Sequence, residues 1–395
     1  MPAIERVETF LFNPNASKNL MLCRVTASDG TYGWGEAYVG KGKEQIAKDM
    51  IDAMANVVKG HSVFEIRHLT QVMFDDFQIR RSAVDYFSAW SAIEIALWDI
   101  AGKLTGQPVC NLLGGPVRDH VRVYANGWWF GTQSIDDTIE RCKKVQAMGF
   151  NAVKWDPFFG PWRSYIDRRD EDIAVEHVRA MRETFPEMDL MIEVHRRLSP
   201  YNAIHFAERI REYDPFVFEE PCLSDNKDLL LQVKQGAPYA KIVTGETCYT
   251  KAEFKDIFEK HCADIINPDT CVCNGILGMV ELAAMAEPYC VEFSPHNYNS
   301  STVGMAATVH ISAVAPTFNI AELFVNLKEG CDEITTKGLK LENGYLEVPA
   351  GPGLGIDIDV DKLIAHAPKA FPAPALTPLS KEYPSKELGH GGRNV

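Results

Sequence analysis

Three glutamates stand at nearly equal intervals in the middle of the 395-residue chain. Glu193, Glu219 and Glu246 are 26 and 27 residues apart, and each follows a short apolar stretch. If those stretches are adjacent parallel strands, about 4.8 Å apart, the three carboxylates can reach one ion. Oxygen ligands alone suit a hard cation, so the pattern predicts a Mg²⁺ site rather than a Zn²⁺ site. The alternative is three independent, solvated glutamates.

Two histidines are candidates for acid–base chemistry beside that site. His195 lies two residues after Glu193, and strand alternation predicts that both side chains face inward. His296 and Asp269 end two neighbouring later stretches, and a carboxylate on one imidazole nitrogen fixes the tautomer and increases the basicity of the other. His296 is therefore a candidate general base. The alternatives are a core histidine at 195, and a helix-capping aspartate with an unrelated histidine.

A regular alternation of strands and helices predicts the scaffold that positions these residues. Strands are expected to begin near Val121, Ala152, Leu190, Phe216, Lys241, Ile265, Val291 and Asn319. Amphipathic helical stretches lie between most of them, at the spacing of a βα unit. We predict an α/β fold, a modified TIM barrel of the (β/α)7β type. The carboxyl ends of its strands form the mouth, where Lys154, Asp156 and Glu322 also fall.

The barrel is expected to occupy residues 119–344, between two other segments. Residues 1–118 read as three antiparallel strands, around Val7–Phe12, Met21–Val25 and Tyr32–Ala37, followed by helices from Gln45 to Leu104. We predict an α+β capping domain there. Residues 345–395 are expected to return to the capping domain and complete it, and to end in a proline-rich tail.

Composition excludes several classes of partner. The formal net charge of −14 repels nucleic acids and anionic membranes. No apolar run approaches the roughly 18 to 20 residues of a membrane span. Ten scattered cysteines lack the spacing of zinc or redox pairs, so we expect reduced thiols and a cytoplasmic location.

Motifs along essentially the whole chain resemble those of the mandelate racemase branch of the enolase superfamily. In order, they are Ser91–Lys103, Leu112–Gly115, Phe218–Pro221, Gly245-Glu246, Asn267–Asp269, Ser294–His296 and Pro352–Gly355. The resemblance implies that Glu193, Glu219 and Glu246 bind Mg²⁺, which holds a substrate carboxylate while its α-proton leaves. It also implies that Lys154 and Glu322 contact the substrate, and that several identical subunits assemble.

Two departures from the family pattern sharpen the prediction. Many relatives carry Lys-x-Lys on the second strand, but this chain has Lys154-Trp155-Asp156, so the base that a racemase needs on that face is missing. His195 instead resembles the acid of galactonate dehydratase and related sugar-acid dehydratases. Glu193 stands where the family usually has Asp, and its longer side chain can displace the ion slightly.

We therefore expect a Mg²⁺-dependent dehydratase of a sugar acid, an aldonate. His296 with Asp269 removes the C2 proton, and His195 protonates the departing 3-hydroxyl to give a 2-keto-3-deoxy acid. The alternatives are a racemase, epimerase or cycloisomerase on the same fold, and a metal-binding protein without catalysis.

Specificity is expected to come from two cap loops and from side chains around the mouth. The loops are Asn13–Asn19 and Tyr38–Lys43. Several aromatic residues either bind the sugar or pack in the core, namely Trp128, Trp129, Phe158, Phe159 and Trp162. Arg196 and Arg197 either orient the substrate or are solvated. Our predicted substrate-binding set is Lys154, Asp156, Glu322, Arg197 and Trp128.

Overall fold

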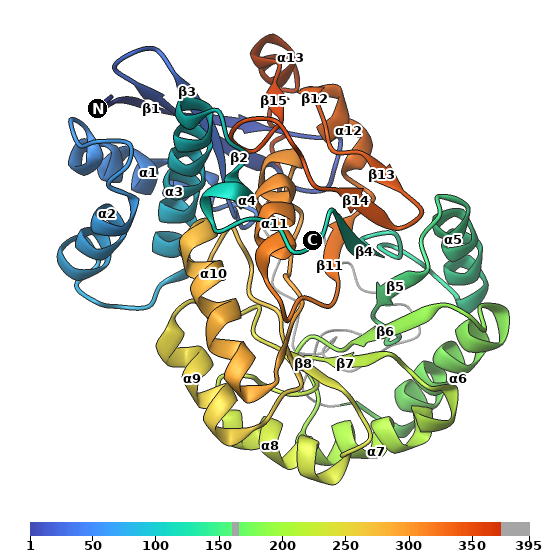
Figure 1. Ribbon diagram of the computed structural model, residues 1–395. Coiled ribbons are helices and arrows are strands. Elements are labelled where there is room, and N and C mark those ends of the chain that lie inside the picture. Colours follow the sequence, from blue (N-terminus) through green and yellow to red (C-terminus); the bar gives the residue numbers. More distant parts are fainter. Residues whose placement is uncertain (160–165, 373–395) are drawn as a thin grey trace.

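The computed structural model describes residues 1–159 and 166–372. Figure 1 shows an N-terminal cap beside a ring of alternating strands and helices. Trp162 and most of the proline-rich tail lie outside the described residues. No described helix is long and apolar enough to cross a membrane.

The cap consists of a three-stranded antiparallel sheet and a set of helices. The strands pair in chain order and are β1 (Ile4–Phe12), β2 (Leu20–Ala27) and β3 (Tyr32–Ala37). The helices are α1 (Glu44–Val58), α2 (Ile66–Val72), the π-helical turn η1 (Met73–Phe77), α3 (Val84–Thr105) and α4 (Val109–Leu112). The expected three strands followed by helices are thus present.

Helix α3 packs unusually close to strand β3, and two glycines make this possible. A Cβ atom on Gly35 would lie 1.8 Å from the carbonyl oxygen of Ala92, and one on Gly33 would lie 2.1 Å from that of Ala96. Any larger residue at either position would push the helix off the sheet. The close contact buries most of α3 and makes it the central helix of the cap.

In the part of the chain that the structure describes, eight parallel strands form the barrel. They are β4 (His120–Asn126), β5 (Ala152–Trp155), β6 (Asp189–Glu193), β7 (Val217–Glu219), β8 (Ile242–Thr244), β9 (Ile265–Ile266), β10 (Glu292–Phe293) and β11 (Ala321–Phe324). Neighbours pair in chain order from β4 to β10, and β11 pairs with the other side of β4. A parallel bridge between Phe293 and Phe318 closes the ring.

Within the described residues, seven long helices connect the strands. They are α5 (Ile135–Ala147), α6 (Arg168–Thr184), α7 (Pro200–Ile210), α8 (Lys227–Gly236), α9 (Lys251–Lys260), α10 (Gly275–Ala286) and α11 (Thr302–Val314), with short turns η2 (Arg211–Tyr213) and η3 (Glu287–Tyr289). Strand β11 is followed only by the six-residue α12 (Lys328–Glu333). The predicted (β/α)7β barrel with an α+β cap is confirmed.

Two buried glutamates of the cap bind the N-termini of barrel helices. Glu36, on β3, accepts hydrogen bonds from the backbone N–H groups of Ser301 (2.8 Å) and Gly304 (2.9 Å) at the start of α11. Glu94, on α3, accepts from the N–H groups of Ile276 (2.7 Å) and Leu277 (3.0 Å) at the start of α10. These carboxylates supply caps that the helices need and join the two domains.

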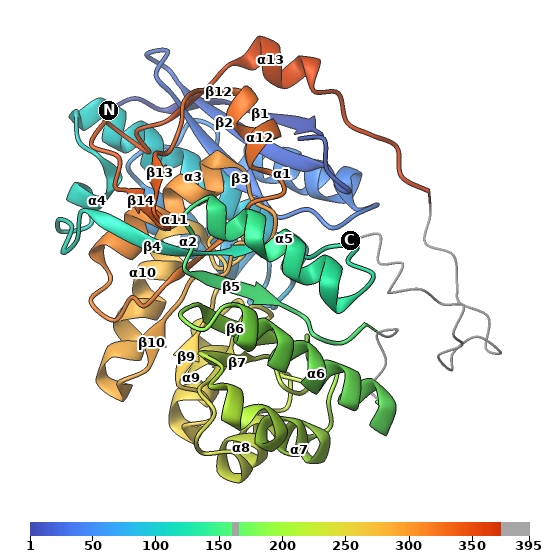
Figure 2. The same cartoon turned by 90° about the vertical axis from the view of Figure 1, so that its right-hand side faces the viewer.

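The C-terminal segment contacts both domains. Its elements, with the two short strands before it, are β12 (Thr335–Lys337), β13 (Leu341–Glu342), β14 (Tyr345–Glu347), β15 (Asp357–Ile358) and α13 (Val360–Ala365). Strand β14 pairs with β4, so the segment expected to begin at residue 345 starts on the barrel. Further on, Asp357 accepts a hydrogen bond from Trp34 of the cap, and Figure 2 shows α13 beside the cap.

Past α13, the chain is tied to a cap loop. Asn19 donates to the carbonyl of Lys369 (2.9 Å) and accepts from its N–H (2.9 Å). The N–H of Asn13 donates to the carbonyl of His366 (3.0 Å). Both ends of the 13–19 loop are therefore fixed by residues about 350 positions away.

Candidate active site

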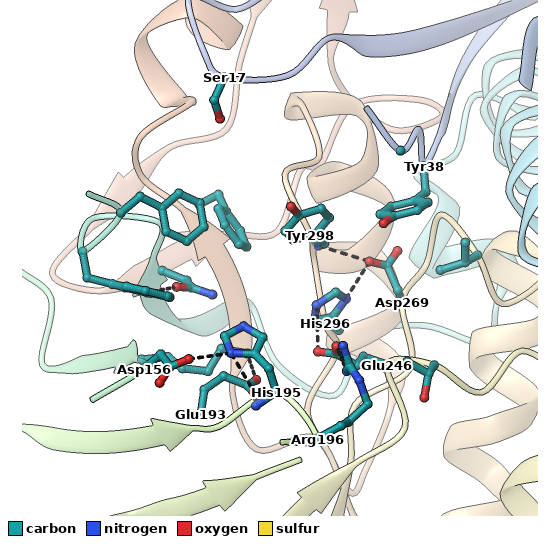
Figure 3. A pocket seen from close by; sticks show the side chains of 18 of the residues that line it. Ser17, Tyr38, Asp156, Glu193, His195, Arg196, Glu246, Asp269, His296 and Tyr298 are labelled. Atoms are coloured by element: carbon teal, nitrogen blue, oxygen red, sulfur yellow. Dashed lines mark hydrogen bonds and ion pairs between the residues drawn. The ribbon is translucent and has the colours of Figure 1, made fainter. Parts of the chain in front are cut away.

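A cavity of about 640 Å³ lies at the carboxyl ends of the barrel strands, beside the cap. Its described walls come from both domains (Figure 3). The cap contributes Ser17, Tyr38, Gly40, Lys43, Val84 and Asp85. The barrel contributes, among others, Asn126, Trp129, Lys154, Asp156, Glu193, His195, Arg196, Glu246, Asp269, His296 and Tyr298. Both cap loops that we expected at the mouth therefore reach the cavity wall.

The three predicted metal-binding glutamates converge at this mouth. Glu193 ends β6 and Glu219 ends β7, and the parallel register places them side by side. Glu246 lies two residues beyond β8. One oxygen of each carboxylate lies within 4.8 Å of the others. Three oxygen donors in this arrangement fit a hard divalent cation.

Lys154 lies in the middle of these acids. Its Nζ is 2.5 Å from Glu219 Oε1, 2.9 Å from Glu322 Oε1 and 3.6 Å from Glu193 Oε2. Burial lowers the pKa of Lys154, but Glu219 and Glu322 outweigh this effect, so the pKa lies well above its usual value. Lys154 is therefore a permanent ammonium that neutralises part of the cluster.

The acids of the cluster outnumber Lys154, and their charge favours a further cation. Burial and the neighbouring Glu219 raise the pKa of Glu193 well above its usual value, although Lys154 opposes the shift. A divalent cation among the carboxylates would favour their ionised forms. The donor set and the charge balance both fit such an ion.

Arg196 provides a second positive charge at the edge of the cluster. Its guanidinium hydrogen-bonds Glu246 and lies 3.7 Å from Glu220. Glu220 has a φ of +46° and turns its carboxylate toward Thr244 Oγ1 (2.7 Å) and the N–H of Gly245 (3.1 Å). The first acid of the Glu219-Glu220 pair thus faces the cluster, and the second supports the backbone behind it.

His296 and Asp269 form a pair on one side of the cavity. His296 Nδ1 is 2.8 Å from Asp269 Oδ2, which also accepts from the N–H of Tyr298 (3.1 Å). His296 Nε2 lies 3.3 Å from Glu246 and 3.5 Å from Glu322. Burial lowers the pKa of His296, but the surrounding carboxylates outweigh this effect and raise the pKa to about 9. Glu322 makes the largest contribution among these carboxylates.

His195 lies on the other side, beside Glu193 and Asp156 (Figure 3). Its Nδ1 is 3.0 Å from Asp156 Oδ2. Our reason for its orientation is wrong, because β6 ends at Glu193 and His195 has a φ of +49°. A turn, and not strand alternation, directs the side chain: the N–H of His195 donates to Glu193 Oε1 at 2.5 Å.

Asp156 and Arg197 form a buried ion pair next to His195. Arg197 Nη2 lies 2.5 Å from Asp156 Oδ1 and 2.6 Å from Oδ2. Burial raises the pKa of Asp156, but Arg197 and His195 outweigh it, so the net pKa is below its usual value. Arg197 is only 5% exposed, so it is not a solvated charge, and it does not line the described part of the cavity.

Two other predicted substrate-binding residues also lie behind the described cavity wall. Glu322 is fully buried beside Lys154. Trp128 packs in the core, and its Nε1 donates to the carbonyl of Ala125 at 3.2 Å. The next residue, Trp129, faces the cavity instead, with its ring 6.3 Å from that of His195. The chain turns at Gly127, with a φ of +74°, so strand periodicity no longer applies.

Three residues in or beside the described site are among those that the sequence analysis did not single out. Asn126 ends β4 and donates to Glu322 at 2.6 Å, and its position at a strand end could have identified it. Tyr298 contacts Asp269 through its backbone and stacks on His296, with ring centroids 6.2 Å apart. Lys18 comes from the cap, with Nζ 4.2 Å from the centre of the Tyr298 ring. No local sequence signal connects Lys18 with a barrel residue.

Comparisons with known proteins agree with this architecture. The family model described as the mandelate racemase / muconate lactonizing enzyme N-terminal domain matches residues 11–114. The model described as the enolase C-terminal domain-like family matches residues 137–362. The chain therefore belongs to the mandelate racemase branch of the enolase superfamily.

Individual relatives are similar over most of the chain. The D-gluconate dehydratase of Thermoproteus tenax is 33% identical over 342 residues, which are 86% of this chain and 68% of the relative. The D-gluconate/D-galactonate dehydratase of Picrophilus torridus is 31% identical over 363 residues, 90% of this chain and 91% of the relative. A mandelate racemase/muconate lactonizing enzyme structure from Sulfitobacter sp. has a TM-score of 0.87 at 27% identity, covering 94% of this chain and 96% of that chain.

Proposed function

We propose that the protein is a dehydratase of a sugar acid, an aldonate, that forms a 2-keto-3-deoxy acid. The observation that carries the proposal is the pair of imidazoles in one cavity, on two sides of the glutamate cluster. His195 stands beside Glu193, and His296 stands beside Glu246. Water elimination needs a base at C2 and an acid at the 3-hydroxyl, and two histidines in different surroundings can fill these roles. The names of the two relatives above support the same reaction class.

Glu193, Glu219 and Glu246 would hold Mg²⁺ in this enzyme. When bound, Mg²⁺ supplies positive charge that stabilises the substrate carboxylate as negative charge develops on it. Lys154, which faces the cavity within the same cluster, adds a fixed ammonium to that stabilisation. Glu322 accepts from Lys154 and from Asn126, so it orients these two polar groups rather than the substrate.

The proton transfers follow from the two histidine environments. Neutral His296, the form that a cation held at Glu246 would favour, keeps Nδ1 bound to Asp269 and takes the C2 proton at Nε2. The C–H electron pair becomes the double bond of the enediolate. This electron pair then forms the C2–C3 double bond as the C3–O bond breaks. His195 gives its proton to the departing hydroxyl, which leaves as water. The resulting enol gains a proton at C3 and becomes the 2-keto acid.

A racemase or epimerase is the competing function on this fold. It requires an acid–base group on each face of the α-carbon. The second-strand position that would supply a lysine is Asp156, which already accepts from Arg197 and lies in contact with His195. This arrangement supports elimination over racemisation.

The proposal is tested by screening aldonic and aldaric acids with Mg²⁺ and detecting 2-keto acids as semicarbazones. We expect keto acid from at least one aldonate. His296→Asn should abolish both turnover and exchange of the C2 proton with D₂O. His195→Asn should abolish turnover but retain exchange.

Three results would contradict the proposal. Inversion at C2 without keto acid would identify an epimerase. Full dehydration activity in both histidine variants would remove their assigned roles. No reaction and no C2 exchange with any acid of the screen would favour a metal-binding protein without catalysis. Exposed Glu140→Gln serves as the control for handling and folding, and should retain wild-type turnover.

We also propose that the enzyme acts in the cytoplasm as an assembly of identical subunits. All ten cysteines are free, and nine of them are buried, which suits a reducing compartment. The assembly is implied by the family resemblance. Sedimentation of the purified protein tests it, and a purely monomeric protein at working concentration would contradict it.

A further inference from the structure

We propose that Asp156 is a positioning residue for His195 rather than a substrate ligand, and that Arg197 fixes Asp156 in this role. The inference deepens the proposed function and rests on it, because it concerns the step in which His195 protonates the leaving hydroxyl. It also changes our expectation for Asp156 and Arg197, which we had placed in the substrate-binding set.

The hydrogen bonds of Asp156 leave it no acceptor position for a substrate. Oδ1 accepts from Arg197 Nη2 (2.5 Å) and from the N–H of Phe158 (3.0 Å). Oδ2 accepts from Arg197 Nη2 (2.6 Å) and pairs with His195 Nδ1 (3.0 Å). A carboxylate has about four acceptor sites, and all are in use. Asp156 is also only 3% exposed.

This network determines which nitrogen of His195 can react. An ionised carboxylate only accepts hydrogen bonds, so Nδ1 of His195 must carry the proton that it donates to Asp156. Because Nδ1 keeps its proton for Asp156, we assign the proton transfer in the cavity to Nε2. The backbone is held as well, because the N–H of His195 donates to Glu193 and that of Arg196 to the carbonyl of Glu220 at 2.7 Å.

Arg197 anchors the network to the barrel. Its side chain is 5% exposed, and its Nε donates to the carbonyl of Val194 at 3.0 Å. The guanidinium thus joins the end of β5, which carries Asp156, to the turn after β6, which carries His195. A buried guanidinium in this position fixes the carboxylate in one orientation.

His296 shows the same principle with different donors. Its partner Asp269 accepts from the N–H groups of Cys271 (2.7 Å) and Tyr298 (3.1 Å), in addition to His296. Each histidine of the cavity therefore has its Nδ1 on an aspartate that other donors immobilise. The donors are backbone amides for Asp269, and mainly Arg197 for Asp156.

The test compares Asp156→Asn with the wild type in three reactions of one aldonate that the enzyme dehydrates. We expect loss of water to slow by about 100-fold, typical of losing a group that orients a reacting histidine. The rate of C2 proton exchange and the KM should each stay within about threefold of the wild-type value, because neither depends on His195 acting as the general acid. Elimination from the 3-deoxy-3-fluoro analogue should slow by less than about tenfold, because fluoride leaves with less need of a proton.

Arg197→Met should show the same pattern more weakly, since Asp156 keeps its charge but loses its anchor. The control is Asp172→Asn, which removes an exposed partner of Arg209 and should leave all three reactions unchanged. Parallel losses of exchange and dehydration, with a raised KM, would mean that Asp156 binds substrate and would overturn the proposal.

A second measurement does not depend on turnover. At a pH high enough to remove one proton from the acid form of the ring, the ¹⁵N shifts of His195 should report the Nδ1–H tautomer in the wild type, and a mixture with Nε2–H in Asp156→Asn. Identical ring shifts in the two folded proteins would overturn the positioning role. Failure of the dehydratase proposal gives a different result. The wild type would then form no keto acid, whereas Asp156→Asn would still change the tautomer of His195.

Discussion

Buried carboxylates occur in two regions of this protein, and their surroundings differ. At the cap–barrel interface, Glu36 and Glu94 accept hydrogen bonds from fixed backbone N–H groups at the starts of α11 and α10. At the barrel mouth, the clustered glutamates lie near one another and near side-chain cations. Lys154 lies 2.5 Å from Glu219, and Arg196 hydrogen-bonds Glu246.

This difference separates a structural acid from one that is ready for a ligand. Backbone amides cannot leave, so the interface glutamates have permanent partners that belong to the fold. Side-chain cations can move, and carboxylates crowded together favour a cation of higher charge. Burial alone therefore does not identify a functional acid, whereas the kind of partner does.

The largest effect is expected from Glu219→Gln at the mouth. The rate of dehydration should fall at least about 1000-fold. The variant removes a carboxylate that holds the cation, and this cation stabilises the negative charge that develops on the substrate. The thermal midpoint of unfolding without Mg²⁺ should shift by less than about 4 °C. Lys154 keeps its ion pair with Glu322, and the repulsion between residue 219 and Glu193 is relieved. Keto acid assays and calorimetry measure the two quantities. A large loss of stability with normal turnover would mean that Glu219 is a structural acid and not part of the functional site.

The interface counterpart is Glu94→Ala. It removes the acceptor of the Ile276 and Leu277 N–H groups and of Trp98 Nε1 at 2.6 Å. We expect the free energy of unfolding to fall by about 3 kcal/mol, because buried donors lose their partners. Mg²⁺ affinity of the folded fraction should change less than about threefold. Urea unfolding and titration calorimetry check both values, and a selective loss of Mg²⁺ binding would contradict the assignment.

A pH dependence of stability should come from the same interface. Burial raises the pKa of Glu94 to about 8 and that of Glu36 to about 7, against the opposing N–H groups. An acid with a raised folded pKa binds a proton more tightly in the folded state, so stability must fall as pH rises from about 5 to 8. Urea unfolding across this range measures the slope. Glu94→Gln should flatten it, and an unchanged slope would exclude Glu94 as its source.

The smallest effect is expected from Arg196→Gln. Removal of the guanidinium from Glu246 should tighten Mg²⁺ binding by about five- to tenfold, about 1 kcal/mol, because a competing cation is lost. Calorimetric titration measures the change, and exposed Arg211→Gln is the control. Weaker Mg²⁺ binding would show that Arg196 supports the cluster rather than competing with the ion.

The barrel could be predicted because its order in space follows its order in sequence. Glu193, Glu219 and Glu246 belong to three consecutive βα units, and consecutive parallel strands are neighbours in the ring. The pairing of Asp269 with His296 follows from the same rule, since β9 and β10 are adjacent. The regular spacing of the strands along the sequence is therefore enough to predict which acids and histidines meet at the mouth.

Local turns and contacts between domains could not be predicted in this way. Strand alternation gave the wrong reason for the orientation of His195, because the chain leaves the strand conformation before that residue. The loop aromatics named from the sequence could not separate Trp128, which packs in the core, from Trp129, which faces the cavity. The barrel partners of Lys18 and Glu36 are more than 260 residues away, in another domain. No sequence period indicates such pairs, because they depend on how the two domains pack.

The two-way hydrogen bond between Asn19 and Lys369 has a practical consequence for protein engineering. The loop that contains Asn19 also contributes Ser17 to the cavity wall. The hydrogen bond fixes this loop to a stretch close to the carboxyl end of the described chain. Truncation before residue 369, or a fusion partner inserted there, would release that loop and alter which compounds the enzyme accepts. Shortened variants for assays of substrate range should therefore retain Lys369.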